Sequence, residues 1–253
     1  MADIDRIVAL GASNLTRGFR EMVSAARSEW GPEVEILAAT GHGRSYGASS
    51  RVLFRTLPGI LQSGLWRVLE CLPPAPTRAL VTDAGNDILY GYSTSRILSW
   101  LEETLNRLQR ATHDIIIAGL PIATVKRLSP TTYLMFRSLL FPSSRLSFSE
   151  VMDSVEQLHV GLEQLAAARG LKFRRLNPGW YGVDPIHIRR SLLRSAWLEL
   201  LDCCSGAKAD EDSFAEALRL YLMAPERRRL FGIKQFTPQK GVWLPQGGRV
   251  WLF

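Results

Sequence analysis

Short apolar runs alternate with amphipathic helical patterns along this chain, and no other feature of the sequence constrains its fold as strongly. Runs typical of buried strands occupy residues 7–10, 34–39, 79–83 and 114–121, with a weaker, edge-like run at 171–176. Apolar residues at helical spacing occupy 15–26, 95–109, 151–165 and 189–201. Strands that alternate with helices pair in parallel through right-handed crossovers. The sequence therefore predicts a three-layer α/β/α sandwich with about five parallel strands.

The remaining segments complete this outline. Residues 52–65 predict a helix interrupted at 58–59, and residues 210–223 predict another. The end of the chain, 242–253, is nearly symmetric about a glycine pair and predicts a β-hairpin. Because the character of the sequence changes after residue 204, we expect an α/β domain at 1–204 and a C-terminal extension at 205–253 packed on it. The hydrophobic content of 46% supports a sizeable core.

Composition argues against several functional classes. The net charge of +7 allows an acidic partner, but the arginines are dispersed, and their densest cluster, 227–229, is too short to indicate nucleic-acid binding. Three cysteines form neither a disulfide framework nor a metal-ligand pattern, so we expect no metal site. No apolar run reaches transmembrane length, and the first ten residues do not resemble a signal peptide. We therefore expect a cytoplasmic protein without stable membrane insertion.

A turn at Gly11-Ala12-Ser13 follows the first predicted strand. It places Ser13 at the carboxyl end of that strand and at the amino end of a helix. Ligands of open α/β sheets bind at this edge, and free backbone N–H groups there favour negative charge. A serine in this position can act as a nucleophile if a base reaches it. The alternative is that Ser13, Asn14 or Thr16 only caps the helix.

A glycine-rich loop, residues 40–50, follows the second predicted strand. Gly41, Gly43 and Gly47 mark positions where the backbone turns sharply or approaches another group closely. Their spacing differs by one residue from a dinucleotide-binding fingerprint, and no acidic residue stands where a ribose would require it. We therefore do not predict nucleotide binding. His42 in this loop either contacts a substrate or belongs to the polar surface.

Further polar groups lie after the third predicted strand and in a loop late in the chain. Asn86 lies in an Ala-Gly-Asn-Asp sequence at 84–87, and Asp184 precedes His187 by three residues. A carboxylate that holds one ring nitrogen of a histidine lets the other nitrogen accept a serine proton. The Asn86 amide and the backbone N–H groups of Ser13 and Gly43 would form an oxyanion hole. Alternatively, Asn86 belongs to a simple turn. Asp184 and His187 could instead bind a metal, but no third ligand accompanies them in the sequence.

These four motifs, in this order, resemble those of the SGNH hydrolases, also called GDSL-type esterases and lipases. Residues 11–13 resemble the family's Gly-Asp-Ser block, with Ala12 in place of Asp. Gly43, or alternatively Gly41 or Gly47, matches the glycine of the second block. Residues 84–87 resemble Gly-x-Asn-Asp with Ala84 in place of the first Gly, and residues 184–187 match Asp-x-x-His. The resemblance covers the chain up to about residue 200, and the extension has no recognised counterpart.

The resemblance implies a flavodoxin-like SGNH hydrolase fold and a serine hydrolase that cleaves a carboxylic ester of a small molecule through an acyl-enzyme. Ser13 would be the nucleophile, His187 the base, Asp184 its partner, and Ser13, Gly43 and Asn86 the oxyanion donors. Residues near these blocks and in the later excursion are expected to contact substrate: Asn14, His42, Arg44, Asp87, Phe136 and Phe141. Two alternatives remain: an acyltransferase with the same triad, and a non-catalytic binding module with this fold.

An excursion at 122–149 follows the fourth strand and is too long for an ordinary connection. It is rich in apolar residues and carries four basic residues but no acidic residue. One interpretation is an apolar acyl pocket with a positive rim, which would favour medium acyl chains and anionic groups. The other is that the segment packs against the C-terminal hairpin or against a second copy of the chain.

Overall fold

The computed structural model describes residues 5–140, 145–203, 214–245 and 247–253, without the side chains of 135, 136, 138–140 and 214. Its central sheet has the strand order β10-β11-β2-β1-β5-β6-β7. The five predicted parallel strands are all present: β1 (Arg6–Leu10), β2 (Glu35–Ala39), β5 (Thr77–Val81), β6 (Asp114–Ala118) and β7 (Lys172–Arg174). The predicted α/β architecture is confirmed, with seven strands in the sheet instead of about five.

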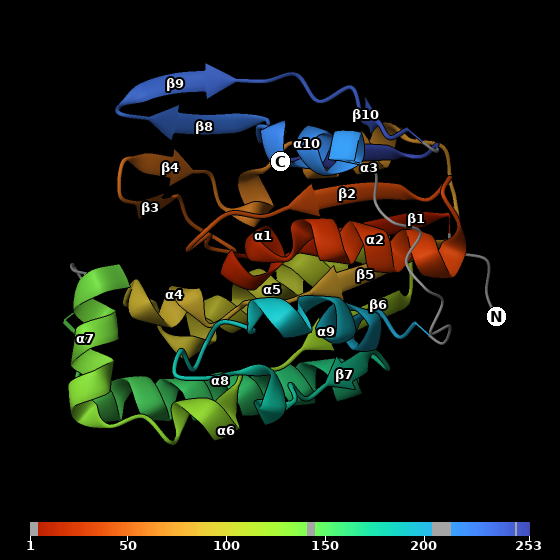
Figure 1. Cartoon of the computed structure of the whole chain (residues 1–253). Helices are drawn as coiled ribbons and strands as arrows, with labels where there is room; N and C mark the ends of the chain where they lie inside the picture. The colour runs from red at the N-terminus through yellow and green to blue at the C-terminus, as the bar shows by residue number, and fades with distance from the viewer. Residues whose placement is uncertain (1–4, 141–144, 204–213, 246) are drawn as a thin grey trace.

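Helices cover both faces of the central sheet and form three layers (Figure 1). Every residue of β1 and β5 is buried, as expected for strands with both faces covered. Alternate residues of β1 face opposite sides: Val8 and Leu10 belong to one core, and Ile7 and Ala9 to the other. The first core packs against α3 (Leu65–Cys71), α5 (Thr94–Leu108) and α8 (Phe148–Ala168). The second packs against α2 (Phe19–Trp30), α9 (Leu193–Leu200) and α10 (Phe214–Leu222).

The C-terminal extension contributes to the central sheet. The predicted hairpin forms from β10 (Val242–Trp243) and β11 (Arg249–Leu252). β11 also pairs in parallel with β2, and the amide of Phe253 donates to the carbonyl of Ala38 at 2.8 Å. The end of the chain is apolar and buried, so it extends the sheet instead of only packing on the preceding domain.

A second sheet was not predicted from the sequence. Its strands, in the order β3-β4-β8-β9, are β3 (Ser50–Val52), β4 (Arg55–Leu57), β8 (Arg227–Leu230) and β9 (Ile233–Phe236). The helix expected at 52–65 is therefore wrong, and only the 3-10 turn η1 (Ile60–Gln62) follows the strands before α3. The error arose because β4 pairs with β8, which lies far away in the sequence.

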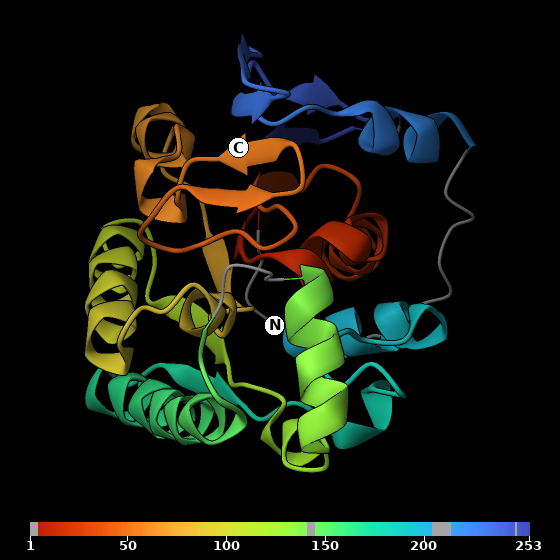
Figure 2. The same cartoon turned by 90° about the vertical axis from the view of Figure 1, so that its left-hand side faces the viewer.

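Two further helical predictions change in detail. The helix expected at 15–26 is divided into α1 (Ser13–Arg17) and α2 at Gly18, where a Cβ atom would lie 2.2 Å from Nε1 of Trp197. The excursion contains α6 (Ile122–Val125) and α7 (Pro130–Leu140). In Figure 1, α7 and the turns of the second sheet project on the left, which is the side that faces the viewer in Figure 2. Among the described helices, none is long and apolar enough to span a membrane.

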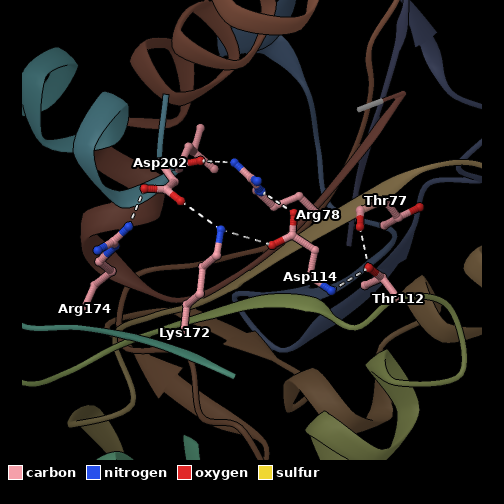
Figure 3. A network of polar contacts seen from close by, with 8 residues as sticks. Thr77, Arg78, Thr112, Asp114, Lys172, Arg174 and Asp202 are labelled. Atoms are coloured by element: carbon pink, nitrogen blue, oxygen red, sulfur yellow. Dashed lines mark hydrogen bonds and ion pairs between the residues drawn. The ribbon is translucent and has the colours of Figure 1, made fainter. Parts of the chain in front are cut away.

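An ion-pair network joins the amino ends of β5, β6 and β7 to the end of α9 (Figure 3). Arg78 donates to Asp114 at 2.7 Å and to the carbonyl of Leu201 at 2.7 Å. Lys172 bridges Asp114 and Asp202 at 3.6 and 2.8 Å. Hydrogen bonds from Lys172 hold the pKa of Asp202 below its usual range against the opposing effect of partial burial. The network fixes the edge of the sheet opposite the carboxyl ends of the strands.

We expect Asp202→Asn to lower the free energy of unfolding at neutral pH by about 1 kcal/mol. Because folding lowers the pKa of Asp202, its contribution is present above the unfolded-state value and disappears as pH falls through the folded-state value. Asparagine tolerates the positive φ of 60° at this position. Urea unfolding between about pH 3 and pH 7 measures the effect. Asp153→Asn, at an exposed position of α8, is the control, and equal acid dependence in both variants would contradict this prediction.

Candidate active site

The site lies where the strand order reverses, between β1 and β5. Ligands of doubly wound sheets bind at this switch point, outside the carboxyl ends of the strands. Ser13 begins α1 directly after β1, and Asn86 begins α4 (Asn86–Leu89) after β5. The amide of Thr82 donates to the carbonyl of Leu10 at 2.9 Å, which joins the ends of the two strands.

Asp83 holds the turn around Ser13. Its Oδ2 atom accepts hydrogen bonds from the amides of Ala12, Asn14 and Leu15 at 2.9, 3.0 and 3.2 Å. Its backbone has a φ of 58°, a conformation that Asp adopts more readily than most residues. The sequence pattern assigned Asp83 only to a strand end and missed this role. A carboxylate from the neighbouring strand thus supports a turn that carries Ala12 where the resemblance would place Asp.

Asn14 connects the turn around Ser13 to the loop that carries Asp184 and His187. Its Nδ2 atom donates to Oδ1 of Asp83 and to the carbonyl of Ile186, both at 2.9 Å. Its Oδ1 atom accepts from the amide of Ile188 at 2.9 Å. We predicted that Asn14 contacts substrate. Its buried side chain lines a cavity together with Ser13, and these bonds engage its hydrogen-bonding groups within the protein. Asn14 also positions the loop that carries His187 relative to Ser13.

Asp184 and His187 form the predicted pair. The Nδ1 atom of His187 lies 2.7 Å from Oδ2 of Asp184, whose Oδ1 accepts from the amides of Ile186 and His187 at 3.2 and 3.1 Å. Burial acts to raise the pKa of Asp184, but the hydrogen bonds outweigh it and lower this pKa below the usual range. Asp184 is therefore an ionised carboxylate at neutral pH, suited to orient the imidazole.

Ser13, Gly43, Asn86 and His187 line one cavity. The Nδ2 atom of Asn86 is buried and has no hydrogen-bond partner among the described residues. Gly43 has a φ of 63°, and a Cβ atom there would lie 2.5 Å from Cγ2 of Val52. The structure thus brings the predicted oxyanion donors to the same cavity as the serine and the histidine.

The other loop positions are distinguished by their surroundings. Gly41 packs against Leu57 and Gly47 against Trp100, and neither lines the cavity that Ser13 shares with Gly43. His42 does line it. Desolvation and the nearby Arg55 lower the pKa of His42, which favours a neutral imidazole.

A second cavity, which is apolar, also reaches Ser13 and Asn86. Residues of α4, α6, α7, α8 and the segments between them form its walls: Ile88, Leu120, Val125, Leu128, Tyr133, Phe148, Val151, Met152 and Val155. Ser13, Asn86 and Ile186 belong to both cavities. The two cavities therefore meet at the serine. Among the described residues, no cluster of three or more His, Cys, Asp or Glu side chains could hold a metal ion.

No family model matches the sequence, and no curated protein matches it. Solved structures of three esterases share its architecture. An inhibitor-bound aryl esterase from M. smegmatis has a TM-score of 0.53 at 14% identity, covering 78% of this chain and 97% of that one. A carbohydrate acetylesterase family member from Sinorhizobium meliloti has a TM-score of 0.52 at 16% identity, with coverage of 78% and 95%. Esterase EstA from Pseudoalteromonas sp. has a TM-score of 0.50 at 14% identity, covering 78% of this chain and 97% of that one. The chain shares the α/β fold of these three esterases.

Within this fold, Arg44 is fully buried and does not line the cavity shared by Ser13 and His187, contrary to the prediction that it contacts substrate. It donates to the carbonyls of Pro58 and Thr40, both at 3.1 Å, and to the main-chain oxygen of Phe253. Burial, with a contribution from Arg55, lowers the pKa of Arg44 to about 9. Arg44 thus ties the glycine loop to the end of the chain, and its expected contact with substrate is corrected.

Asp87 is also buried and turned to the protein interior. Its Oδ2 atom accepts from the amide of Tyr46 at 2.9 Å, while the Tyr46 hydroxyl donates to the carbonyls of Leu10 and Thr82. Burial raises the pKa of Asp87 to about 6. Asp87 therefore anchors the glycine loop instead of contacting substrate. The side chain of Phe136 and the whole of Phe141, also expected at the substrate site, lie outside the described residues.

Proposed function

We propose that this chain is a serine esterase that cleaves a carboxylic ester of a small molecule through an acyl-enzyme. The observation that carries the proposal is the single cavity lined by Ser13, Gly43, Asn86 and His187, with His187 held by Asp184 at 2.7 Å. The three esterases with this fold give independent support. No cofactor is required for this chemistry.

The proposed reaction follows from the roles of these groups. Ser13 Oγ attacks the acyl carbon while His187 accepts its proton, and the charge that develops on the carbonyl oxygen is stabilised by the Ser13 and Gly43 amides and Asn86 Nδ2. The ester C–O bond then breaks, and His187 returns the proton to the leaving alcohol. Water repeats the sequence on the acyl-enzyme and releases the acid.

A fluorophosphonate probe and intact-mass measurement test the proposal directly. We expect covalent addition of one probe molecule, located at Ser13 by peptide mapping and absent from Ser13→Ala. A folded protein that gains no adduct would instead be the non-catalytic binding module. Product analysis with an added alcohol separates hydrolysis from acyl transfer, since only a transferase converts most of the acyl group to the new ester.

Asn86→Ala should reduce kcat by about 10²- to 10³-fold, because it removes one oxyanion donor. KM should change little if the amide acts mainly on the transition state. The melting temperature serves as the control for folding. A variant with wild-type kcat would remove Asn86 from the proposed oxyanion hole.

The apolar cavity is the proposed acyl site, because it begins at Ser13 and is walled by α6, α7 and α8. Each buried methylene would strengthen acyl binding by up to about 0.8 kcal/mol. We therefore expect kcat/KM for aryl esters to increase as the acyl chain lengthens beyond acetyl. Arg137 also lines this cavity and could accept an anionic group at its rim.

Met152→Trp should shift the preference back towards acetyl, because Met152 lines the acyl cavity and a larger side chain would shorten it. The matched control is Val160→Trp on the same helix, where the side chain is 50% exposed. A series of aryl esters from acetyl to decanoyl measures the effect. If kcat/KM is greatest for acetyl in the wild type and neither variant changes the profile, the cavity does not bind the acyl chain.

A further inference from the structure

The second sheet presents a strongly basic outer face. Along β8, Arg227 and Arg229 are exposed while Arg228 and Leu230 are half-buried. In the strand register, Arg229 is paired with Lys234 on one side and with Thr56 on the other. Thr56 is in turn paired with Arg51, so Arg51, Arg229 and Lys234 lie on the same face. We call Arg51, Arg227, Arg229 and Lys234 the basic face. No acidic residue occurs in 50–57 or 227–236, and Glu226, immediately before β8, forms an ion pair with Arg227 at 3.6 Å.

Large apolar side chains form the two turns at one end of this sheet. Leu53, Phe54 and Phe231 are 77%, 59% and 69% exposed, and we call them the apolar tips. The rings of Phe54 and Phe231 stack with centroids 4.8 Å apart, and the amide of Phe231 donates to the carbonyl of Phe54 at 2.9 Å. The two turns therefore form one continuous apolar patch.

Both features oppose the stability of the isolated protein. Leu53 and Phe231 have φ values of 53° and 49°, where bulky residues are strained and Gly or Asn would be favoured. Arg229 lies directly opposite Lys234, and like charges in cross-strand pairs repel each other. An external partner that is anionic and offers an apolar phase would relieve the repulsion and bury the tips.

The apolar tips also border the candidate active site. Leu53, Phe54 and Phe231 line the cavity that contains Ser13 and His187. The turns of the sheet project on the side of the molecule that Figure 2 presents to the viewer. A surface that receives the tips would therefore lie at the mouth of that cavity.

We propose that the second sheet docks the protein on an anionic lipid surface. The apolar tips enter the boundary between headgroups and acyl chains, and the basic face contacts the anionic headgroups. The Ser13 cavity then opens towards the lipid. Docking itself is independent of catalysis, whereas delivery of a lipid-held ester to Ser13 rests on the proposed function.

Charge decides between this partner and a second copy of the chain. The outer strand β9 is exposed along its whole length, and such strands can pair with another copy. A second copy would, however, bring Lys234 and Arg229 towards identical positive charges.

The test uses the full chain with Ser13→Ala, so that no ester is consumed. We expect flotation with mixed phosphatidylcholine–phosphatidylglycerol vesicles, but not with phosphatidylcholine alone, and release at high salt. Arg229→Glu with Lys234→Glu, and separately Leu53→Asn with Phe231→Asn, should each reduce the partition coefficient at least about tenfold. The melting temperature of the variant with Leu53→Asn and Phe231→Asn should be no lower than that of the Ser13→Ala protein. Leu222→Asn, at a 68% exposed position on α10, is the unaffected control.

Equal binding to both vesicle types, or unchanged binding of both double variants, would overturn the docking proposal. So would a dimer in light scattering that either double variant dissociates, or nucleic-acid binding without flotation. In the catalytically intact protein, Arg229→Glu with Lys234→Glu should keep hydrolysis of a soluble aryl ester and lose hydrolysis of an ester held in anionic vesicles. Failure of the proposed esterase function would appear differently, as flotation without fluorophosphonate labelling.

Discussion

Replacement of Ser13 by alanine should reduce kcat for aryl-ester hydrolysis by at least about 10³-fold and abolish fluorophosphonate labelling. Removing the nucleophile of a serine triad commonly costs several orders of magnitude, and the remaining groups act on the same step. Ser13 Oγ makes no hydrogen bond to the other described residues, so folding should be unaffected. Hydrolysis and thermal unfolding of the two proteins measure both effects.

Ser28→Ala is the matched control, because Ser28 lies on the adjacent helix α2 and donates only to the carbonyl of Ala25 at 2.9 Å. It should retain full activity and labelling. If Ser13→Ala keeps activity within tenfold of the wild type at an unchanged melting temperature, another group performs the attack and the proposed mechanism fails.

The central fold could be predicted from sequence because its signals are local. The strands that end in Leu10, Ala39 and Val81 are short apolar runs with polar or glycine-rich boundaries, and tertiary packing preserves them as strands. The second sheet has no such signal. Residues 55–57 read as part of a helix until Leu230 and Arg229 are placed beside them.

The candidate site divides in the same way. Asp184 and His187 are three residues apart, so the pair could be inferred from spacing alone. The role of Asp83 could not, because its three amide partners lie some 70 positions earlier in the sequence and become neighbours only through the pairing of β1 with β5. Arg44 was misassigned for a related reason, since its partner Phe253 is brought to it by β11.

Asp184→Asn should lower kcat by about 10³- to 10⁴-fold with little change in melting temperature. In the proposed mechanism, the carboxylate accepts a hydrogen bond from the Nδ1–H group of His187, and Nε2 is then free to accept the Ser13 proton. An amide that donates to Nδ1 would hold the opposite tautomer. The asparagine keeps an oxygen for the amides of Ile186 and His187, so the loop should retain its conformation.

The pH profile separates this role from a merely structural one. Because the pKa of Asp184 is lowered, its carboxylate is ionised throughout the neutral range. The titration of Asp184 should therefore not limit activity near neutral pH. The wild-type kcat/KM should instead rise from acid to neutral pH, because a histidine must be neutral to act as the base. Rates from about pH 5 to about pH 9 measure this, together with the rate of fluorophosphonate labelling in both proteins. If Asp184→Asn labels at the wild-type rate, Asp184 supports the loop without directing the base, and the triad is reduced to Ser13 and His187.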